Sequence, residues 1–446
     1  MNRVLLKGTA LAASVTVSGL TGSVAADSVE RSLRPVERPY LGSLQLASIT
    51  VVESLRPVLR PASLGQKPIK VAAADGGFQD WIVDFRTRAI AQGISMATLN
   101  RAFKGVHYDP EVIKRDRNQS EFTKTIWDYL DSAASPTRIR NGQAALKKHD
   151  KTLTRIEAKY GVDKEVVLAI WGLESAYGTF KGSKDVVRSL STLAYDARRS
   201  AFFEQQLVAA LKILQAGDVD PRNMTGSWAG AMGHTQFIPT SYLDYAVDFT
   251  GDGKRDIWSE DPTDALASTA AYLAKFGWVQ GQPWGVEVTL PKGFNYRLAD
   301  RKIEKRPRDW ADLGVRGTDG KVVPNHGKGS ILLPAGGQGA AFMIFKNFEV
   351  IERYNTADAY VIGVGHLADR IQGGAPIQAE WPRGDRALTL TEREEMQRRL
   401  TAKGFDTQGI DGKIGPKTID AVRSYQVAQG LVPDGYASLS LLTKLR

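Results

Sequence analysis

Apolar residues recur at helical spacing along most of the chain. Phe78, Trp81 and Phe85 are spaced to share one face of a helix that begins near residue 78. Helices are also expected over residues 121–130, 151–160, 163–177, 185–215, 264–276 and 350–372, with two of them in 185–215. The spacing therefore predicts a mainly helical protein.

The apolar period changes from helical to alternating between about residues 284 and 350. Val286, Val288 and Leu290 alternate with other residues, and residues 340–348 are typical of a strand. A small β insertion is therefore expected within the helical chain. The predicted fold class is mainly α (α+β).

The last part of the sequence is set off by a linker, residues 382–389, that follows a stretch rich in Gly and Pro. Residues 390–446 are too few for a large core. Their length suits a module of three helices.

The N-terminus is typical of a secretory signal. Arg3 and Lys7 precede a weakly apolar run over residues 8–20, and small residues follow at positions 23–26. The run is too short and too polar for a stable membrane-spanning helix. Residues 1–26 are therefore expected to be a signal peptide, cleaved after residue 25 or 26.

A proline- and arginine-containing leader is expected over residues 27–77. Residues 32–39 (SLRPVERP) recur almost unchanged as residues 54–61 (SLRPVLRP). Proline at this density opposes helix formation and extends the chain. The segment is either a disordered leader or a basic spacer that touches an anionic surface.

The charge of the chain favours a polyanionic partner without identifying it. Lys and Arg number 59 against 49 Asp and Glu, which gives a net charge of +10. Nucleic acid, acidic lipid or an anionic wall polymer would fit, as would a surface charged only for solubility. Cysteine is absent, which excludes disulfides, thiol nucleophiles and a lipidated cysteine. The five histidines show no zinc-binding spacing.

The helix predicted over residues 163–177 carries one unusual carboxyl group. Asp163 is expected to cap it and Gly178 to end it, and between them it is apolar almost all round. Glu174 lies on the face of Ile170, where partial burial raises a carboxyl pKa and can keep the group protonated. Such a group can donate a proton to a leaving oxygen, as in glycoside cleavage, or it can be a structural buried glutamate.

A second segment, residues 227–242 (SWAGAMGHTQFIPTSY), is dense in small residues followed by polar and aromatic ones. Glycines allow a ligand to approach the backbone closely. Hydroxyl and amide groups suit sugar hydroxyls, and aromatic faces suit sugar rings. The segment therefore favours a carbohydrate ligand.

With these motifs the sequence resembles the membrane-bound lytic transglycosylase B family, murein-cleaving enzymes with a lysozyme-like catalytic domain. The similarity covers residues 78–381. Its motifs are ESxYG at 174–178, GAMGxxQFxPxSY at 230–242, GDGxxDIW at 251–258 and RYN at 353–355. Residues 390–446 are similar to a peptidoglycan-binding domain, through Gln397, Leu400, Gly404, Phe405, Asp411, Gly412, Gly415, Pro416, Thr418, Tyr425, Gln426, Asp434 and Gly435.

The resemblance implies a reaction with one catalytic carboxyl group. Glu174 would protonate the oxygen between N-acetylmuramic acid and N-acetylglucosamine, then accept a proton from the muramic 6-hydroxyl as that hydroxyl closes a 1,6-anhydro ring. No water is consumed, so no second carboxylate is needed, unlike in ordinary glycosidases. Asp185 and Asp196 are the nearest other acids, and a capping or surface role is expected for both.

The resemblance also implies a set of substrate-binding residues. Ser227, Gln236, Tyr354 and Asn355 match family residues that hold the sugar and its acetamido group. Tyr129, Tyr272 and Tyr360 fall at corresponding positions, and each also fits a role as a core or rim aromatic residue.

Residues 248–259 resemble a calcium-binding loop, and the family relative can bind calcium there. Oxygens could come from Asp248, Thr250, Asp252 and the carbonyl of Lys254. The loop departs from the pattern with Thr at position 3, Arg255 at position 8 and Ser259 in place of the closing Glu. Asp264 or Asp261 would have to close the site, and a turn without metal is the other interpretation. No cofactor is expected to be required.

The leading hypothesis is an exported, periplasmic lytic transglycosylase that binds peptidoglycan glycan strands. A monomer is expected, with no stable membrane anchor and no nucleic-acid partner. A hydrolysing muramidase, a non-catalytic wall-binding protein and a nucleic-acid binder are the alternatives, and the last conflicts with export.

Overall fold

The computed structural model describes residues 71–117, 124–196 and 198–446. The predicted signal peptide, residues 1–26, and both copies of the repeated octet lie outside these described residues. The predicted leader does not extend to residue 77, because helix α2 already begins at Val71. Residues 71–75 are mostly alanine, which favours helix without leaving an apolar period to recognise.

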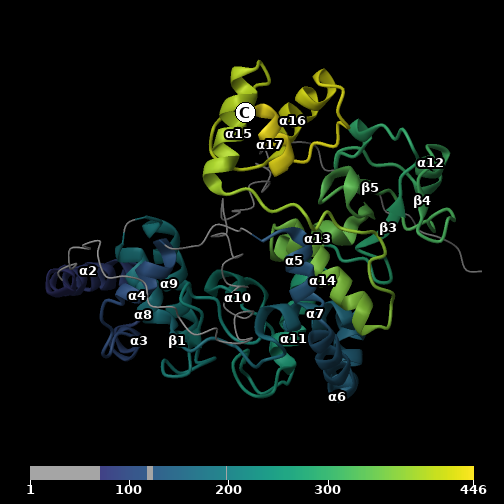
Figure 1. Cartoon of the computed structure of the whole chain (residues 1–446). Coiled ribbons are helices and arrows are strands. Elements are labelled where there is room, and N and C mark those ends of the chain that lie inside the picture. The colour runs from purple at the N-terminus through teal and green to yellow at the C-terminus, as the bar shows by residue number, and fades with distance from the viewer. Residues whose placement is uncertain (1–70, 118–123, 197) are drawn as a thin grey trace, which may run out of the picture. The chain divides into compact units, whose positions relative to one another are not determined.

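The described helices are labelled in Figure 1. They are α2 (Val71–Ala91), α3 (Met96–Ala102), α4 (Pro110–Arg117), α5 (Ile126–Ala133), α6 (Pro136–Tyr160), α7 (Lys164–Ser175), α8 (Val186–Tyr195), α9 (Ser200–Ala216), α10 (Pro239–Tyr245), α11 (Thr263–Lys275), α12 (Pro307–Asp312), α13 (Lys346–Tyr354), α14 (Asp358–Ile371), α15 (Leu390–Ala402), α16 (Pro416–Ala428) and α17 (Leu439–Leu445). Short 3-10 helices cover Tyr296–Leu298 and Gly336–Gln338.

Several predicted helices have different bounds in the structure. The one expected over 350–372 is two helices, α13 and α14, separated by residues 355–357. The helix expected at 121–130 begins at Ile126, capped by the hydroxyl of Thr125, while residues 121–123 with Phe122 lie outside the described residues. The helix expected at 151–160 is the end of α6, which begins fifteen residues earlier at Pro136, behind the capping hydroxyl of Ser135. Its first turns carry too many exposed polar residues for an apolar period to stand out.

Helix α7 is buried as predicted, because α6, α11 and α14 pack against it. Every residue from Val166 to Leu173 is buried. Both predicted ends of the helix differ in detail. Asp163 makes no capping bond and instead accepts hydrogen bonds from Trp278 Nε1 and the amide of Gly281. The helix ends at Ser175, before Gly178, because Ala176 adopts a left-handed conformation with φ of 49°.

The predicted β insertion is present as a four-stranded antiparallel sheet in the order β4-β3-β6-β5. Its strands are β3 (Gly285–Thr289), β4 (Arg316–Gly317), β5 (Ser330–Leu332) and β6 (Ala341–Ile344), and β1 (Lys184–Asp185) pairs with β2 (Thr225–Gly226) elsewhere. The sheet has its own core around Trp310 and Met343. The strand predicted over 340–348 is too long, because α13 begins at Lys346 and buries Phe348 from a helix.

The C-terminal module consists of three helices, as predicted. α15 begins with a capping box in which Thr389 and Glu392 bond each other's backbone amides. Met396, Leu400, Val422 and Leu442 form a core that is separate from the other two. The mainly helical α+β fold class is therefore confirmed.

Asp369 on α14 makes the stability of the fold depend on pH. Burial raises its pKa to about 6, although Trp284 Nε1 donates a hydrogen bond to its Oδ2 at 2.9 Å. A raised carboxyl pKa contributes stability that is complete below about pH 4 and is lost as pH rises through about 6. Asp369→Asn should therefore raise the free energy of unfolding by about 1–2 kcal/mol near pH 8 and change it little near pH 4.

Urea unfolding at the two pH values measures this effect. The exposed Asp80→Asn serves as the control and should be neutral at both. A gain of equal size at both pH values would show that ionisation of Asp369 is not its cause.

Candidate active site

The carboxyl group of Glu174 is half-buried near the C-terminal end of α7. The hydroxyl of Tyr360, on α14, donates a hydrogen bond to Glu174 Oε1 at 2.7 Å. Tyr360 is completely buried, so its ring cannot move far. Burial, and after it the charge of Glu174, raises the pKa of Tyr360 well above its ordinary value, which keeps the hydroxyl a donor.

Tyr129, on α5, also lies near Glu174. Burial raises the pKa of Tyr129, and the charge of Glu174 raises it further. α14 packs against both α5 and α7. A Cβ atom at Gly363 of α14 would lie 2.9 Å from the Tyr129 ring, so the glycine permits this close approach. The structure thus brings together three of the predicted site residues, Glu174, Tyr129 and Tyr360.

The chain turns sharply after Glu174 and is held in that turn by hydrogen bonds. Ala176 and Tyr177 both have positive φ, of 49° and 58°. The hydroxyl of Tyr177 donates to the carbonyl of Arg138 on α6, and Ser175 Oγ donates to the carbonyl of His234 at 2.6 Å. Non-glycine residues in this conformation are strained and often lie at functional sites.

The side chain of His234 also stabilises this turn through hydrogen bonds, a role that the sequence did not indicate. Trp171 Nε1 donates to His234 Nδ1 at 3.1 Å, so the ring proton is on Nε2, which donates to the carbonyl of Ser259 at 2.6 Å. A Cβ atom at Gly178 would lie 2.6 Å from the ring. Burial lowers the pKa of His234, in keeping with a neutral ring. Only its place beside glycine in the 227–242 segment could have hinted at this role.

His234→Ala should lower the free energy of unfolding by about 3 kcal/mol, because it leaves the buried Trp171 Nε1 without its acceptor and opens a cavity. Urea unfolding measures the loss. The exposed His107→Ala is the control and should stay within about 0.5 kcal/mol of the parent protein. A loss for His234→Ala as small as that of the control would contradict the role assigned to the ring.

Besides His234, its neighbours Thr235 and Gln236 link the 227–242 segment to other parts of the site by hydrogen bonds. The carbonyl of Thr235 accepts a hydrogen bond from the hydroxyl of Tyr354 at 2.5 Å. Gln236, half-buried with φ of 55°, donates from Nε2 to the carbonyl of Lys181 at 3.0 Å. The segment is therefore fixed both to α13 and to the loop that follows Glu174.

The other predicted substrate residues make bonds within the protein. Ser227 Oγ accepts from the amides of Ala229 and Ala231. Asn355 is buried and accepts from the amide of Ala357 at the start of α14. Tyr272 is also buried, with its hydroxyl donating to the carbonyl of Arg353. These bonds account for the positions of the side chains, and contact with a sugar stays a prediction for each of them.

The two other acids considered near the site have structural roles. The carboxylate of Asp185 caps α8 by accepting the amide of Arg188 at 2.9 Å. Asp196 forms an ion pair with Arg117 at 2.7 Å. Both observations agree with the predicted capping and surface roles.

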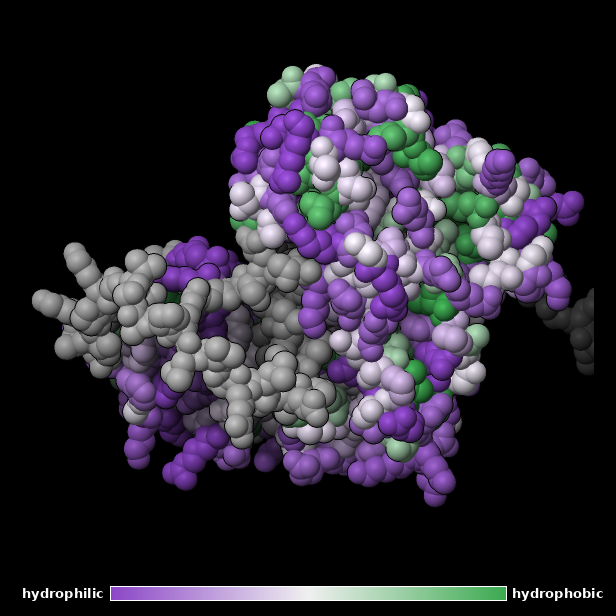
Figure 2. Space-filling model, viewed as in Figure 1, coloured by the Kyte–Doolittle hydropathy of each residue, from purple (hydrophilic) through white to green (hydrophobic). Residues whose placement is uncertain are grey.

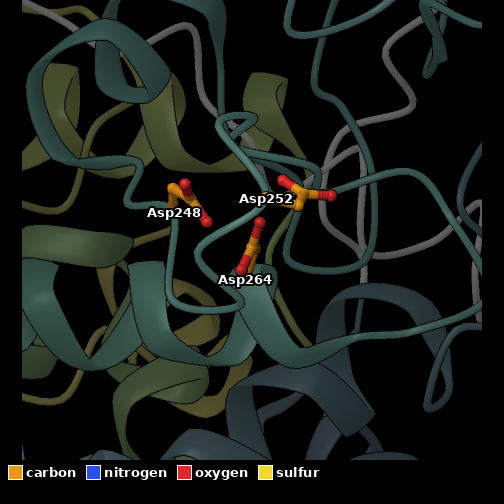
Figure 3. Close-up of side chains that lie close together, drawn as sticks. All are labelled: Asp248, Asp252 and Asp264. Carbon is orange, nitrogen blue, oxygen red and sulfur yellow. The ribbon is translucent and has the colours of Figure 1, made fainter.

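We call the predicted calcium loop, residues 248–259, together with Asp264 the acidic loop. It brings together the carboxylates of Asp248, Asp252 and Asp264, with one oxygen of each within 4.8 Å of the others (Figure 3). Asp264 closes the cluster from the first turn of α11. Asp261 instead accepts from the amide and hydroxyl of Thr263. Of the two residues considered for closing the site, the structure therefore places Asp264 there.

This loop is already well hydrogen-bonded by its own chain. Asp264 accepts from the amides of Phe249, Thr250 and Asp256, and Asp248 accepts from those of Gly251 and Gly253. The amide of Gly251 contributes most to lowering the pKa of Asp248. Burial raises the pKa of Asp264, and the charge of Asp248 adds to the rise.

The donor set of the loop still fits a calcium ion. Its oxygens come from carboxylates and from the Thr250 hydroxyl, which donates to Asp248 Oδ1 at 3.2 Å. Calcium takes such hard oxygen ligands. An oxygen of Asp264 lies close to those of Asp248 and Asp252, so Asp264 could supply the closing carboxylate that Ser259 lacks. The backbone amide of Lys254 donates a hydrogen bond to Asp252. The carbonyl of Lys254 stays a predicted calcium ligand.

Comparison with known proteins identifies the class to which this site belongs. The family model of the transglycosylase SLT domain matches residues 77–369, more than half of the chain. The model of a putative peptidoglycan binding domain matches residues 389–445. The chain therefore belongs to the transglycosylase SLT domain family and carries a C-terminal peptidoglycan-binding domain, as its motifs indicated.

Individual relatives are lytic transglycosylases. Membrane-bound lytic murein transglycosylase B of Escherichia coli (strain K12) is 32% identical over 250 residues, which cover 54% of this chain and 66% of that protein. The structure of SltB3 from Pseudomonas aeruginosa in complex with NAG-anhNAM-pentapeptide is 50% identical, with a TM-score of 0.81, over 83% of this chain and 99% of that one. Escherichia coli Slt35 in complex with calcium is 28% identical, with a TM-score of 0.56, over 67% and 94%.

Proposed function

We propose that this chain cleaves the β-1,4 bond between N-acetylmuramic acid and N-acetylglucosamine in peptidoglycan and leaves 1,6-anhydromuramic ends. The observation that carries the proposal is the half-buried carboxyl of Glu174, held by the Tyr360 hydroxyl at the end of a buried helix. Membership of the SLT domain family and the bound NAG-anhNAM-pentapeptide of SltB3 support it.

Glu174 acts twice in the proposed reaction. Its carboxyl proton passes to the bridging oxygen as the bond from that oxygen to the anomeric carbon breaks. The resulting carboxylate accepts the proton of the muramic 6-hydroxyl while that oxygen bonds to the anomeric carbon. Protons balance without water, so one carboxyl group suffices. The fixed turn after Glu174 and the Tyr360 hydroxyl keep the carboxyl in one place for both steps.

Release of soluble fragments from purified murein sacculi tests whether the chain is an enzyme. The proposal expects the suspension to clear and fragments to appear in the supernatant. A protein that sediments with sacculi but releases nothing would instead be the non-catalytic wall-binding protein.

We also propose that the chain is exported and acts on the wall from the periplasm, through a signal peptide over residues 1–26. No helix within the described residues is long and apolar enough to cross a membrane. N-terminal sequencing of the protein produced in a Gram-negative bacterium should start at Ala26 or Asp27. A protein that keeps Met1 and stays in the cytoplasm would contradict export.

We propose that the acidic loop takes one calcium ion as a structural ligand and that the reaction does not require it. The support is the carboxylate cluster together with the calcium complex of the relative Slt35. If the loop binds calcium as weakly as extracellular sites do, about 5 mM calcium should raise the free energy of unfolding by about 1–2 kcal/mol. The melting temperature should then be roughly 2–4 °C higher than in EDTA.

Asp252→Asn should abolish this shift, because it removes an exposed carboxylate ligand. Asp261→Asn, nearby but outside the cluster, should retain it. Murein cleavage should be the same in calcium and in EDTA. Loss of cleavage in EDTA, or an equal thermal shift in Asp252→Asn, would contradict the proposal.

A further inference from the structure

A stripe of positively charged residues runs along α6. Its members are the exposed residues Arg140, Lys147, Lys148, Lys151, Arg155 and Lys159. At 100° per residue, they fall within about one third of the helix circumference, over a length of about 28 Å. We call this surface the α6 stripe.

The two acids of α6 do not neutralise the stripe. Asp150 and Glu157 lie outside its sector of the helix, and both face Lys164. The Lys164 ammonium bonds Asp150 Oδ1 at 2.8 Å, while its amide donates to Glu157 Oε1 at 3.2 Å. Among the described residues, no carboxylate forms an ion pair with any of the six cations. Within the described residues, their positive charges are therefore not compensated by ion pairs.

One end of the stripe borders a shallow open pocket. Arg155 and Lys159 lie over the ring of Phe249, at 5.2 and 5.0 Å from its centre. With Ala158 these residues line an open pocket of about 470 Å³. The cations can therefore reach an anionic group that rests there.

The stripe lies on a helix that packs directly against the helix of Glu174. The opposite face of α6 packs against α7, where the His149 ring lies 5.6 Å from that of Trp171. In the region of Figure 2 where Figure 1 places α6, hydrophilic residues predominate, with some apolar ones among them. An anionic polymer bound along α6 would thus be held beside the catalytic helix.

We propose that the α6 stripe binds the anionic peptide stems of murein and forms a second wall-binding surface besides the C-terminal module. This inference rests on the proposed function, because that function places the chain on peptide-bearing glycan strands. A peptide linked through its amino end keeps a free terminal carboxylate, so a peptide-bearing sacculus is a dense polyanion. Arg and Lys bind carboxylates, Arg in a bidentate manner.

A membrane surface fits the stripe less well. Helices that bind membranes carry large apolar side chains next to their cations. None of the large apolar residues that are exposed within the described part of the chain belongs to α6.

The test compares two triple variants with the same change in net charge, both in the Glu174→Gln background so that sacculi stay intact. One is Lys148→Gln, Lys151→Gln, Arg155→Gln. The control is Lys292→Gln, Lys302→Gln, Lys328→Gln in the β insertion, where all three lysines are exposed. Co-sedimentation with sacculi at about 50 and 300 mM NaCl gives the affinities.

The stripe variant should bind peptide-bearing sacculi about tenfold more weakly than its parent at the lower salt, and the difference should shrink at the higher salt. The control should stay within about twofold. Equal binding by both variants would overturn the proposal. So would an equal loss on glycan strands freed of peptides by an amidase, or a loss confined to phosphatidylglycerol vesicles.

The same triple variant with Glu174 restored separates this inference from the proposed function. It should cleave peptide-free glycan strands at the parental rate. If neither it nor its parent cleaves them, the proposed function fails, while the binding comparison still decides the role of the stripe.

Discussion

Glu174→Gln should lower the rate of murein cleavage by about a thousandfold or more while the protein stays folded. The amide can neither give a proton to the bridging oxygen nor take one from the 6-hydroxyl, and general acid–base catalysis is worth about 10²–10⁴. Glutamine keeps the size of the side chain and an oxygen that can accept from the Tyr360 hydroxyl. Fragment release from sacculi, with circular dichroism and melting temperature for the fold, measures both parts of the expectation.

Glu165→Gln is the matched control, because Glu165 lies on the same helix and is also half-buried. Burial raises its pKa, and the Tyr360 hydroxyl donates to Glu174 instead. It should keep the parental cleavage rate. If Glu174→Gln retained more than about a tenth of the activity, Glu174 would not be the catalytic acid.

Tyr360→Phe should lower kcat/KM by about 10–100-fold, because a hydrogen bond to an ionisable group is worth about 1.5–3 kcal/mol. Without the hydroxyl, the carboxyl of Glu174 loses a donor that favours its charged form and one of the bonds that hold it in place. The protonated form should then persist to higher pH. The alkaline limb of the profile of kcat/KM against pH should therefore move upward.

Tyr242→Phe is the control. It shows whether the shift in the pH profile needs the Tyr360 hydroxyl or follows from the loss of any buried tyrosine hydroxyl. Tyr242 is fully buried and its hydroxyl donates to the carbonyl of Arg255, away from Glu174. It should lose stability without moving the pH profile. A Tyr360→Phe enzyme with lower activity but an unmoved alkaline limb would show that Tyr360 does not tune the proton of Glu174.

The fold was largely predictable, because burial leaves a period in the sequence. α7 was recognised from its apolar run and the β insertion from the alternation around Val288. Element ends were less predictable. The run from Ala340 to Phe348 is largely apolar, so its spacing could not show that a strand gives way to α13 at Lys346.

Without the family resemblance, the site was predictable only where one segment carries the chemistry. Glu174 stands out within its own helix, whereas its contact with Tyr360 joins residues 186 positions apart. The bond between Trp171 and His234 likewise depends on the tertiary fold. Tyr272 and Tyr354 were predicted as sugar-binding residues, and the sequence could not show that their hydroxyls donate to backbone carbonyls.

In the proposed reaction the muramic 6-hydroxyl, and not water, attacks the anomeric carbon, and Glu174 is the only carboxyl that moves protons. Mass spectrometry of the fragments that this protein releases from sacculi tests it most directly. We expect muramic ends lighter than reducing ends by one water, with no heavy oxygen incorporated from labelled water. Reducing ends that carry the label would contradict this expectation and would make the protein a hydrolysing muramidase.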